Sequence, residues 1–166
     1  VNVSSVTVEA GNNQTICLGS SATLNATGTG TFFQWSTGAT TSSITVSPST
    51  TTTYTVTASD ANGCTAVDQV TVTVGSAVAN AGPDQTICSG SSTSLNATGG
   101  TSYQWNTGAT TSSITVNPFA TTTYTVTVSD VNGCTDVDQV TVNVSSVTVE
   151  AGNNQTICLG SSATLN

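Results

Sequence analysis

FFQWSTGATTSSITVSPSTTTTYTV, residues 32 to 56, returns as SYQWNTGATTSSITVNPFATTTYTV at residues 102 to 126. In both copies apolar side chains alternate with polar ones in short runs, and Gly, Asn or Pro separates the runs. This period of two is typical of half-buried strands, whereas no segment of the chain shows the 3.6-residue period of a helix. The stretch therefore predicts short strands packed as an all-β sandwich.

The duplicated stretch belongs to a longer repeat. Residues 1–25 and 142–166 are identical, and the segments QTIC and NGCT recur with a period of about 70 residues,. We expect three units, called repeat 1 (1–75), repeat 2 (76–145) and repeat 3 (146–166, its N-terminal part only). Each complete unit carries its own apolar pattern, which favours separate domains over solenoid coils. The chain is thus expected to be a window from a tandem array.

Repeat 1 is predicted to contain strands at residues 3–9, 21–27, 31–36, 41–47, 51–58 and 64–74. Its inward-facing side chains are expected to be Ala22, Leu24, Ala26, Phe33, Trp35, Ile44, Val46, Tyr54, Val56, Val70, Val72 and Val74. The series Leu24, Trp35, Tyr54 and Val56 has the spacing of strand B, the strand C tryptophan and the Tyr-x-Cys of strand F in immunoglobulin domains. Aliphatic residues replace both sandwich cysteines. We therefore expect immunoglobulin-like sandwiches joined by two small residues at each junction into a semi-rigid rod.

Charge excludes several classes of partner. The 166 residues include no Lys, Arg or His and eight Asp or Glu, for a net charge of −8. A surface without cations cannot neutralise phosphates, so neither nucleic acid nor an anionic membrane surface is an expected partner. No run is long and apolar enough for a transmembrane helix, and no signal-peptide pattern is present at Val1. Direct membrane insertion is therefore not expected.

A catalytic role is not expected either. Without His or Lys the usual general bases are missing, and Ser-His-Asp and Cys-His arrangements cannot form. Paired carboxylates remain, but Asp136 beside Asp138 has no counterpart in repeat 1, where Ala66 stands. We predict a non-enzymatic protein with neither catalytic nor cofactor-binding residues.

Five cysteines fit the repeat pattern. Each complete repeat has two, so we expect the disulfides Cys17–Cys64 and Cys88–Cys134, with Cys158 left without its partner,. The alternative pairs Cys64 with Cys88 across the junction. Zinc is disfavoured because no CxxC motif or His accompanies the cysteines. Disulfides of either pattern indicate an extracellular or periplasmic compartment.

The segment SD(A/V)NGC carries clustered oxygen ligands between two strands. Asn-Gly is typical of a tight hairpin turn, and this interpretation requires no ligand. The alternative is a calcium site, because carboxylate and amide oxygens are preferred calcium ligands. The candidate ligands are Asp60, Asn62, Asp68, Asp130, Asn132 and Asp138.

Repeat 2 contains the segments AGPDQTICSGSS, LNATGG and YQWNTGATTSSITVNPFATTTYTVTVSDVNGCTDVDQVTV. This text resembles the tandem PKD-like and Ig-like repeats of large Bacteroidota surface proteins, including gliding-motility adhesins of the SprB kind. WSTGATT and WNTGATT depart from the usual W-x-F-G-D-G of PKD domains. The resemblance implies type IX secretion, a place on the outer surface of a Gram-negative cell, and a stalk or adhesive filament.

The expected partners are neighbouring repeats, surface glycans or other copies of the filament. Two alternatives remain open: a spacer in a secreted polysaccharide-degrading enzyme, and a self-assembling sheath in which repeats pair at strand edges.

Overall fold

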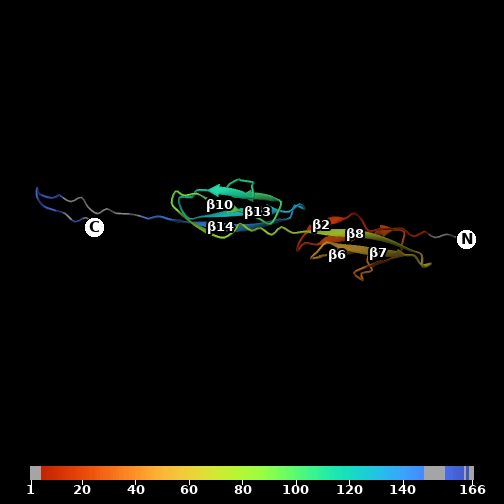
Figure 1. Cartoon of the computed structure of the whole chain (residues 1–166). Helices are drawn as coiled ribbons and strands as arrows, with labels where there is room; N and C mark the ends of the chain where they lie inside the picture. Colours follow the sequence, from red (N-terminus) through yellow and green to blue (C-terminus); the bar gives the residue numbers. More distant parts are fainter. Residues whose placement is uncertain (1–4, 148–155, 163, 165–166) are drawn as a thin grey trace.

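The computed structural model describes residues 5–147, 156–162 and 164. The described residues form fourteen strands and no helix, so none of them lies in a helix that could cross a membrane. Repeats 1 and 2 lie end to end, with β2, β6, β7 and β8 in one body and β10, β13 and β14 in the other (Figure 1). The all-β prediction is confirmed.

Repeat 1 is a sandwich of short strands. One sheet has the order β2-β8-β7-β5, and β3 pairs with β6 on the other side of the core. β1 pairs with β4, which continues the line of β3 beyond Ala26. The strands are β1 Val8–Glu9, β2 Gln14–Cys17, β3 Ala22–Asn25, β4 Thr27–Gly28, β5 Phe32–Trp35, β6 Ser43–Val46, β7 Thr52–Ser59 and β8 Thr65–Gly75.

Repeat 2 repeats this topology. Its larger sheet has the order β11-β13-β14-β9, and β10 pairs with β12. An isolated bridge between Asn80 and Thr98 takes the place of the β1–β4 pair. The strands are β9 Gln85–Cys88, β10 Thr93–Asn96, β11 Ser102–Trp105, β12 Ser113–Val116, β13 Thr122–Ser129 and β14 Thr135–Ser145.

A tryptophan lies at the centre of each core. Trp35 and Trp105 are almost fully buried, and each indole Nε1–H donates to a backbone oxygen 3.0 Å away, that of Thr41 or Thr111. Burying an indole requires such a partner for its polar edge. Ten of the twelve predicted core residues of repeat 1 are buried, while Phe33 and Val74 are half-buried. Val8, Ala10 and Ala58 complete this core although the pattern did not single them out.

These sandwiches are immunoglobulin-like, as predicted. The tryptophan strand β5 pairs with β7, which carries the tyrosine, and β7 pairs with β8. β8 ends at Gly75 and β14 at Ser145, near the proposed boundaries, but the division into three repeats stays a prediction. Most of repeat 3 lies outside the described residues.

The sequence did not predict β2 and β9. Both contain QTIC, and both run parallel to the last strand of their repeat, with Cys17 opposite Gly75 and Cys88 opposite Ser145. At the start of the chain the predicted strand 3–9 is reduced to β1, with residues 1–4 outside the described part. The first strand of each repeat therefore switches sheets and ends at the far end of the sandwich.

Candidate functional site

β2 delivers Cys17 to the junction between the repeats. Gln14–Cys17 pairs with Val72–Gly75, and the N–H of Leu18 donates to the oxygen of Gly75 at 2.9 Å. Because the pairing is parallel, β2 and β8 end at the same edge of repeat 1. Cys17 thus lies where the chain leaves repeat 1.

A disulfide joins the two repeats at this edge. Cys17 of repeat 1 bonds to Cys134 of repeat 2, with the two Cα atoms 5.5 Å apart. Cys134 begins the approach to β14 and is only 3% exposed. The bond therefore connects the end of the larger sheet of repeat 1 to the turn between β13 and β14 of repeat 2.

The predicted pairs Cys17–Cys64 and Cys88–Cys134 are wrong. Cys64 precedes β8 by one residue, whereas Cys17 lies beside the last residue of the same strand. Eleven extended residues span about 35 Å at roughly 3.3 Å each. A disulfide requires Cα atoms within about 7 Å, so the two cysteines of one repeat cannot meet.

The alternative pair Cys64–Cys88 is wrong as well, because Cys64 lies at the end of repeat 1 away from Gly75 and Cys88 lies beside Ser145 at the end of β14. Cys64, Cys88 and Cys158 carry free thiols. The expectation of a disulfide is met, but between different residues, and a disulfide indicates an oxidising, extracellular type of compartment.

Gly75 permits close contact at the junction. A Cβ at this position would lie 2.6 Å from Asp130 Oδ2 and 2.8 Å from Cys134 Sγ. Real Cβ contacts are not that short, so a larger residue would push the two repeats apart. The absence of a side chain at Gly75 lets the turn of repeat 2 rest against β8.

Asp130 shapes the turn that carries Cys134. Its Oδ1 accepts the N–H groups of Asn132 at 2.8 Å and Cys134 at 2.9 Å. Partial burial acts to raise the pKa of Asp130, but hydrogen bonds from Cys134, Asn132 and the N–H of Ser76 hold that pKa below its ordinary value,. Ser76 belongs to the linker, so the carboxylate also ties the linker to the turn.

The same turn occurs in repeat 1. Asp60 Oδ1 accepts the N–H groups of Asn62 and Cys64, both at 2.9 Å. Gly63 and Gly133 adopt φ values of +83° and +81°, which glycine tolerates best,. The hairpin interpretation of SD(A/V)NGC is confirmed.

Two other calcium candidates cap the first strand of each repeat. Asp68 Oδ2 accepts the N–H of Ala10 at 2.6 Å, and Asp138 Oδ2 accepts the N–H of Ala81 at 2.8 Å. The N–H groups of Ala10 and Gln69 hold the pKa of Asp68 below its ordinary value, and those of Ala81 and Gln139 do the same for Asp138, against partial burial,. These carboxylates fasten the strand at the point where it switches sheets.

The structure does not gather the three calcium candidates of either repeat into one site. Asp68 and Asp138 pair in register with Val56 and Val126, whereas Asp60 and Asp130 lie beyond the ends of β7 and β13. Within the described ranges no three His, Cys, Asp or Glu side chains come together as a metal site. Calcium binding at these residues stays a prediction that the geometry does not favour.

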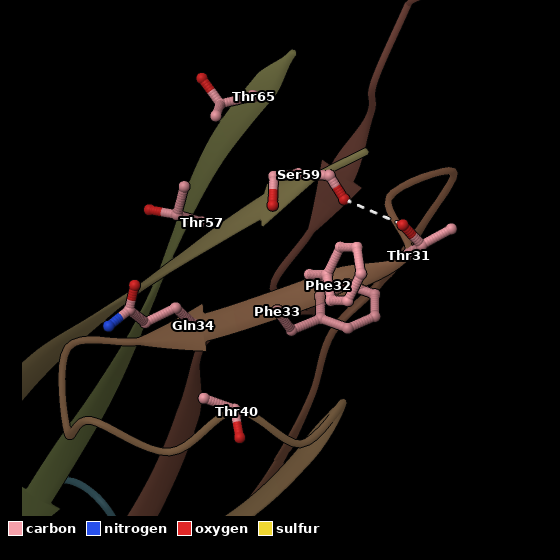
Figure 2. Close-up of a pocket in the computed structure, with 8 residues that line it drawn as sticks. All are labelled: Thr31, Phe32, Phe33, Gln34, Thr40, Thr57, Ser59 and Thr65. Carbon is pink, nitrogen blue, oxygen red and sulfur yellow. Dashed lines mark hydrogen bonds between the residues drawn. The ribbon is translucent and has the colours of Figure 1, made fainter. Parts of the chain in front are cut away.

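Repeat 1 also presents a pocket of about 530 Å³ on its larger sheet (Figure 2). Phe32, 62% exposed, and Phe33 lie on β5 beside hydroxyl and amide side chains. Thr31 Oγ1 donates to the oxygen of Ser59 at 3.4 Å along the rim. The lining residues are Thr31, Phe32, Phe33, Gln34, Thr40, Thr57, Ser59 and Thr65. None of them carries a charge.

This outer face differs between the repeats at one prominent position. Phe32 pairs with Ser59 in repeat 1, and Ser102 pairs with Ser129 in repeat 2. Gln34 and Gln104, paired with Thr57 and Thr127, are the same in both. The exposed ring of Phe32 therefore distinguishes repeat 1 from repeat 2 on this face.

No protein-family model and no curated protein matches the chain. Among solved structures, DIP-gamma IG1+IG2 is similar over 86% of this chain and 95% of that chain, with 12% identity and a TM-score of 0.49. The three N-terminal domains of the bacteriophage RB49 highly immunogenic outer capsid protein (Hoc) are similar over 84% of this chain and 58% of that one, with 21% identity and a TM-score of 0.40. The N-terminal Ig1-2 module of the Drosophila receptor protein tyrosine phosphatase DLAR is similar over 84% of this chain and 98% of that chain, with 13% identity and a TM-score of 0.35.

Proposed function

We propose that this chain is a structural segment of an extracellular stalk or filament, whose repeats hold an adhesive element away from a cell. The observation that carries the proposal is the disulfide between Cys17 and Cys134. A covalent bond between two domains restricts their relative motion, which a stalk requires in order to stay extended.

The linker supports the same role. The larger sheet of repeat 1 ends at Gly75, and Ala79 and Ala81 of repeat 2 are already held by Asp136 and Asp138 at 2.9 and 2.8 Å. Ser76 is engaged by Asp130. With the linker fastened at both ends and a disulfide beside it, the two repeats have little freedom to bend.

The surface fits an exposed filament. With no Lys or Arg in the chain, trypsin-like proteases find no cleavage site, and a net charge of −8 keeps neighbouring filaments apart,. Repeated weak contacts along such a filament add by multivalency. We place the segment on the outer surface of a Gram-negative Bacteroidota cell, in a large adhesin that serves attachment or gliding.

The outer face around Phe32 is the proposed contact surface. An exposed aromatic ring bordered by hydroxyl and amide groups combines apolar and hydrogen-bonding contacts, as small-molecule sites do. An uncharged lining of this kind suits neutral surface glycans.

Small-angle X-ray scattering tests the rod. The oxidised chain should give one narrow, elongated distance distribution, and Cys17→Ser should broaden it because the repeats then move about residues 76–78. Cys88→Ser, at the equivalent place in repeat 2, is the matched control. An unchanged distribution for Cys17→Ser would show that the disulfide does not set the shape.

Immunogold electron microscopy of intact source cells tests the location, with antibody raised against residues 1–141. Label along surface filaments is expected. Label confined to the culture fluid would favour a spacer in a secreted enzyme instead.

A further inference from the structure

We propose that Cys88 and Cys64 are the two open halves of the Cys17–Cys134 linkage, so that Cys88 of one copy forms a disulfide with Cys64 of another. In a longer array the neighbouring repeat supplies the partner thiol. The partner in either case is another repeat of this type, which makes the coupling head-to-tail.

The half that contains Cys88 is already formed. β9 pairs with the end of β14 as β2 pairs with the end of β8, which places Cys88 opposite Ser145 as Cys17 lies opposite Gly75. The N–H of Ser89 donates to the oxygen of Ser145 at 2.9 Å, the same distance as between Leu18 and Gly75. Cys88 is exposed, with a free thiol.

The half that contains Cys64 is formed as well. The N–H of Asp60 donates to the oxygen of Cys64 at 3.1 Å, and in the bonded turn Asp130 and Cys134 make the same contact at 2.9 Å. Asp60 Oδ1 and Asp130 Oδ1 each accept the N–H of the following cysteine at 2.9 Å. The thiol of Cys64 is free and its residue is only half-buried, whereas the bonded Cys134 is buried.

The Cys17–Cys134 disulfide shows which kind of partner these thiols take. Cys17 and Cys134 hold the same positions in their repeats as Cys88 and Cys64, and they form a disulfide across a junction. Both half-sites have the backbone geometry of the bonded junction before any partner arrives.

Bond formation requires an oxidant, for which a small disulfide such as oxidised glutathione suffices. The thiolate of Cys88 attacks one glutathione sulfur, which forms a mixed disulfide and releases one glutathione thiolate. The thiolate of Cys64 then attacks the Cys88 sulfur, and the second glutathione leaves. Two electrons pass to glutathione, and the two thiol protons end on the two released glutathione molecules.

One residue should keep the two repeats farther apart in the Cys88–Cys64 coupling than in the Cys17–Cys134 junction. Ser145 stands where Gly75 lies at the first junction, and a Cβ at Gly75 would lie 2.8 Å from the partner sulfur. The incoming turn must therefore sit slightly farther from Ser145. Ser145→Gly should increase the yield of the intermolecular bond.

The test incubates the whole chain, carrying Cys158→Ser, in a glutathione redox buffer. The protein is kept at about 1 mM, because short linkers supply effective concentrations of that order. We expect a ladder of dimers and longer species on non-reducing gels. Since trypsin finds no Lys or Arg, digestion with chymotrypsin and an Asp-specific protease should yield a Cys88–Cys64 cross-linked peptide.

Two further variants separate a directed coupling from indiscriminate oxidation. In the Cys158→Ser background, Cys64→Ser alone and Cys88→Ser alone should stay monomeric, and their mixture should stop at a heterodimer. Symmetric Cys88–Cys88 or Cys64–Cys64 dimers in the single variants would overturn the proposal. A parent chain that stays monomeric in the same buffer would overturn it as well. The rod proposed above concerns the bonded junction and is not affected by either result.

Discussion

The turns Asp60–Cys64 and Asp130–Cys134 have nearly the same sequence and share the hydrogen bonds that involve their backbone N–H groups, but their cysteines differ in state. Cys134 is 3% exposed and bonded, while Cys64 is half-buried with a free thiol. The second turn rests against Gly75 and bonds to Cys17 of repeat 1, whereas Cys64 bonds to no cysteine among the described residues. In this chain the chemistry of a cysteine is decided at the junction and not within its own fold.

Cys17→Ser should have the largest effect on this contrast, because it makes both turns alike. Removing a bond that closes 117 residues costs roughly 5 kcal/mol in the chain-entropy model,. Thermal and urea unfolding of the oxidised chain should show that loss. Cys88→Ser, in the same position of repeat 2, should change stability by less than about 0.5 kcal/mol. Equal effects of the two variants would contradict the assigned pairing.

Gly75→Ser should weaken the bonded junction in a graded way. The added Cβ meets Asp130 Oδ2 and Cys134 Sγ at under 3 Å, and relieving such overpacking costs about 1–3 kcal/mol,. The disulfide should re-form more slowly after reduction, as followed by thiol alkylation. Ser145→Gly, the reverse change at the other edge, is the matched control and should leave this rate unchanged.

The carboxylates that cap the first strands should act alike in both repeats. The pKa of Asp68 and that of Asp138 lie below the ordinary value of 3.8, so the stabilisation they provide is present above that pH and is lost as pH falls through their folded values,. Urea unfolding between pH 6 and pH 2 should show this decline.

Asp68→Asn and Asp138→Asn should each reduce the decline by a similar amount. The expected loss at pH 6 is about 1 kcal/mol, because charged hydrogen bonds are strong but half-exposed ones are screened. Glu9→Gln removes one exposed charge as the control. A pH profile that neither variant alters would show that other groups control acid unfolding.

Phe32→Ser should have the smallest effect on stability, within about 0.5 kcal/mol, since the ring is 62% exposed,. It gives repeat 1 the outer face of repeat 2 at this position. Binding to a neutral-glycan array should fall, and Ser102→Phe should raise it. Unchanged binding in both variants would remove this face as the contact surface.

Alternation was sufficient to predict the sandwich. Leu24, Trp35 and Val56 are buried because each faces inward on a strand with polar neighbours, and the period of two shows this directly,. The hairpin at Asn62 and Gly63 was equally predictable from the sequence, because Asn-Gly favours the positive φ that Gly63 adopts in the turn,.

The disulfide was not predicted, because one short strand was missed. QTIC has only four residues, and its parallel partner β8 is more than fifty residues away in sequence, so no local pattern reports the pairing. Without β2, the sequence did not indicate at which end of the sandwich Cys17 lies. Parallel pairing itself would have ruled out the predicted bond: a strand parallel to β8 must end at the end of the sandwich far from the turn that carries Cys64.

The capping roles of Asp68 and Asp138 were missed for a similar reason. Their partners, the N–H groups of Ala10 and Ala81, lie 58 and 57 residues earlier. Such contacts depend on how the first strand crosses between sheets. Oxygen-rich spacing alone suggested calcium instead.

The disulfide also changes how the chain would carry mechanical tension. Pulled from its two ends, the polypeptide transmits force up to Cys17, across the sulfur bridge, and onward from Cys134. Residues 18–133 lie on a branch parallel to that path, so they cannot add contour length while the bridge holds, whereas β1, β2 and β14 bear the force directly. Reduction of the bridge would place residues 18–133 on the loaded path as well, so the segment would then lengthen much further by unfolding under tension.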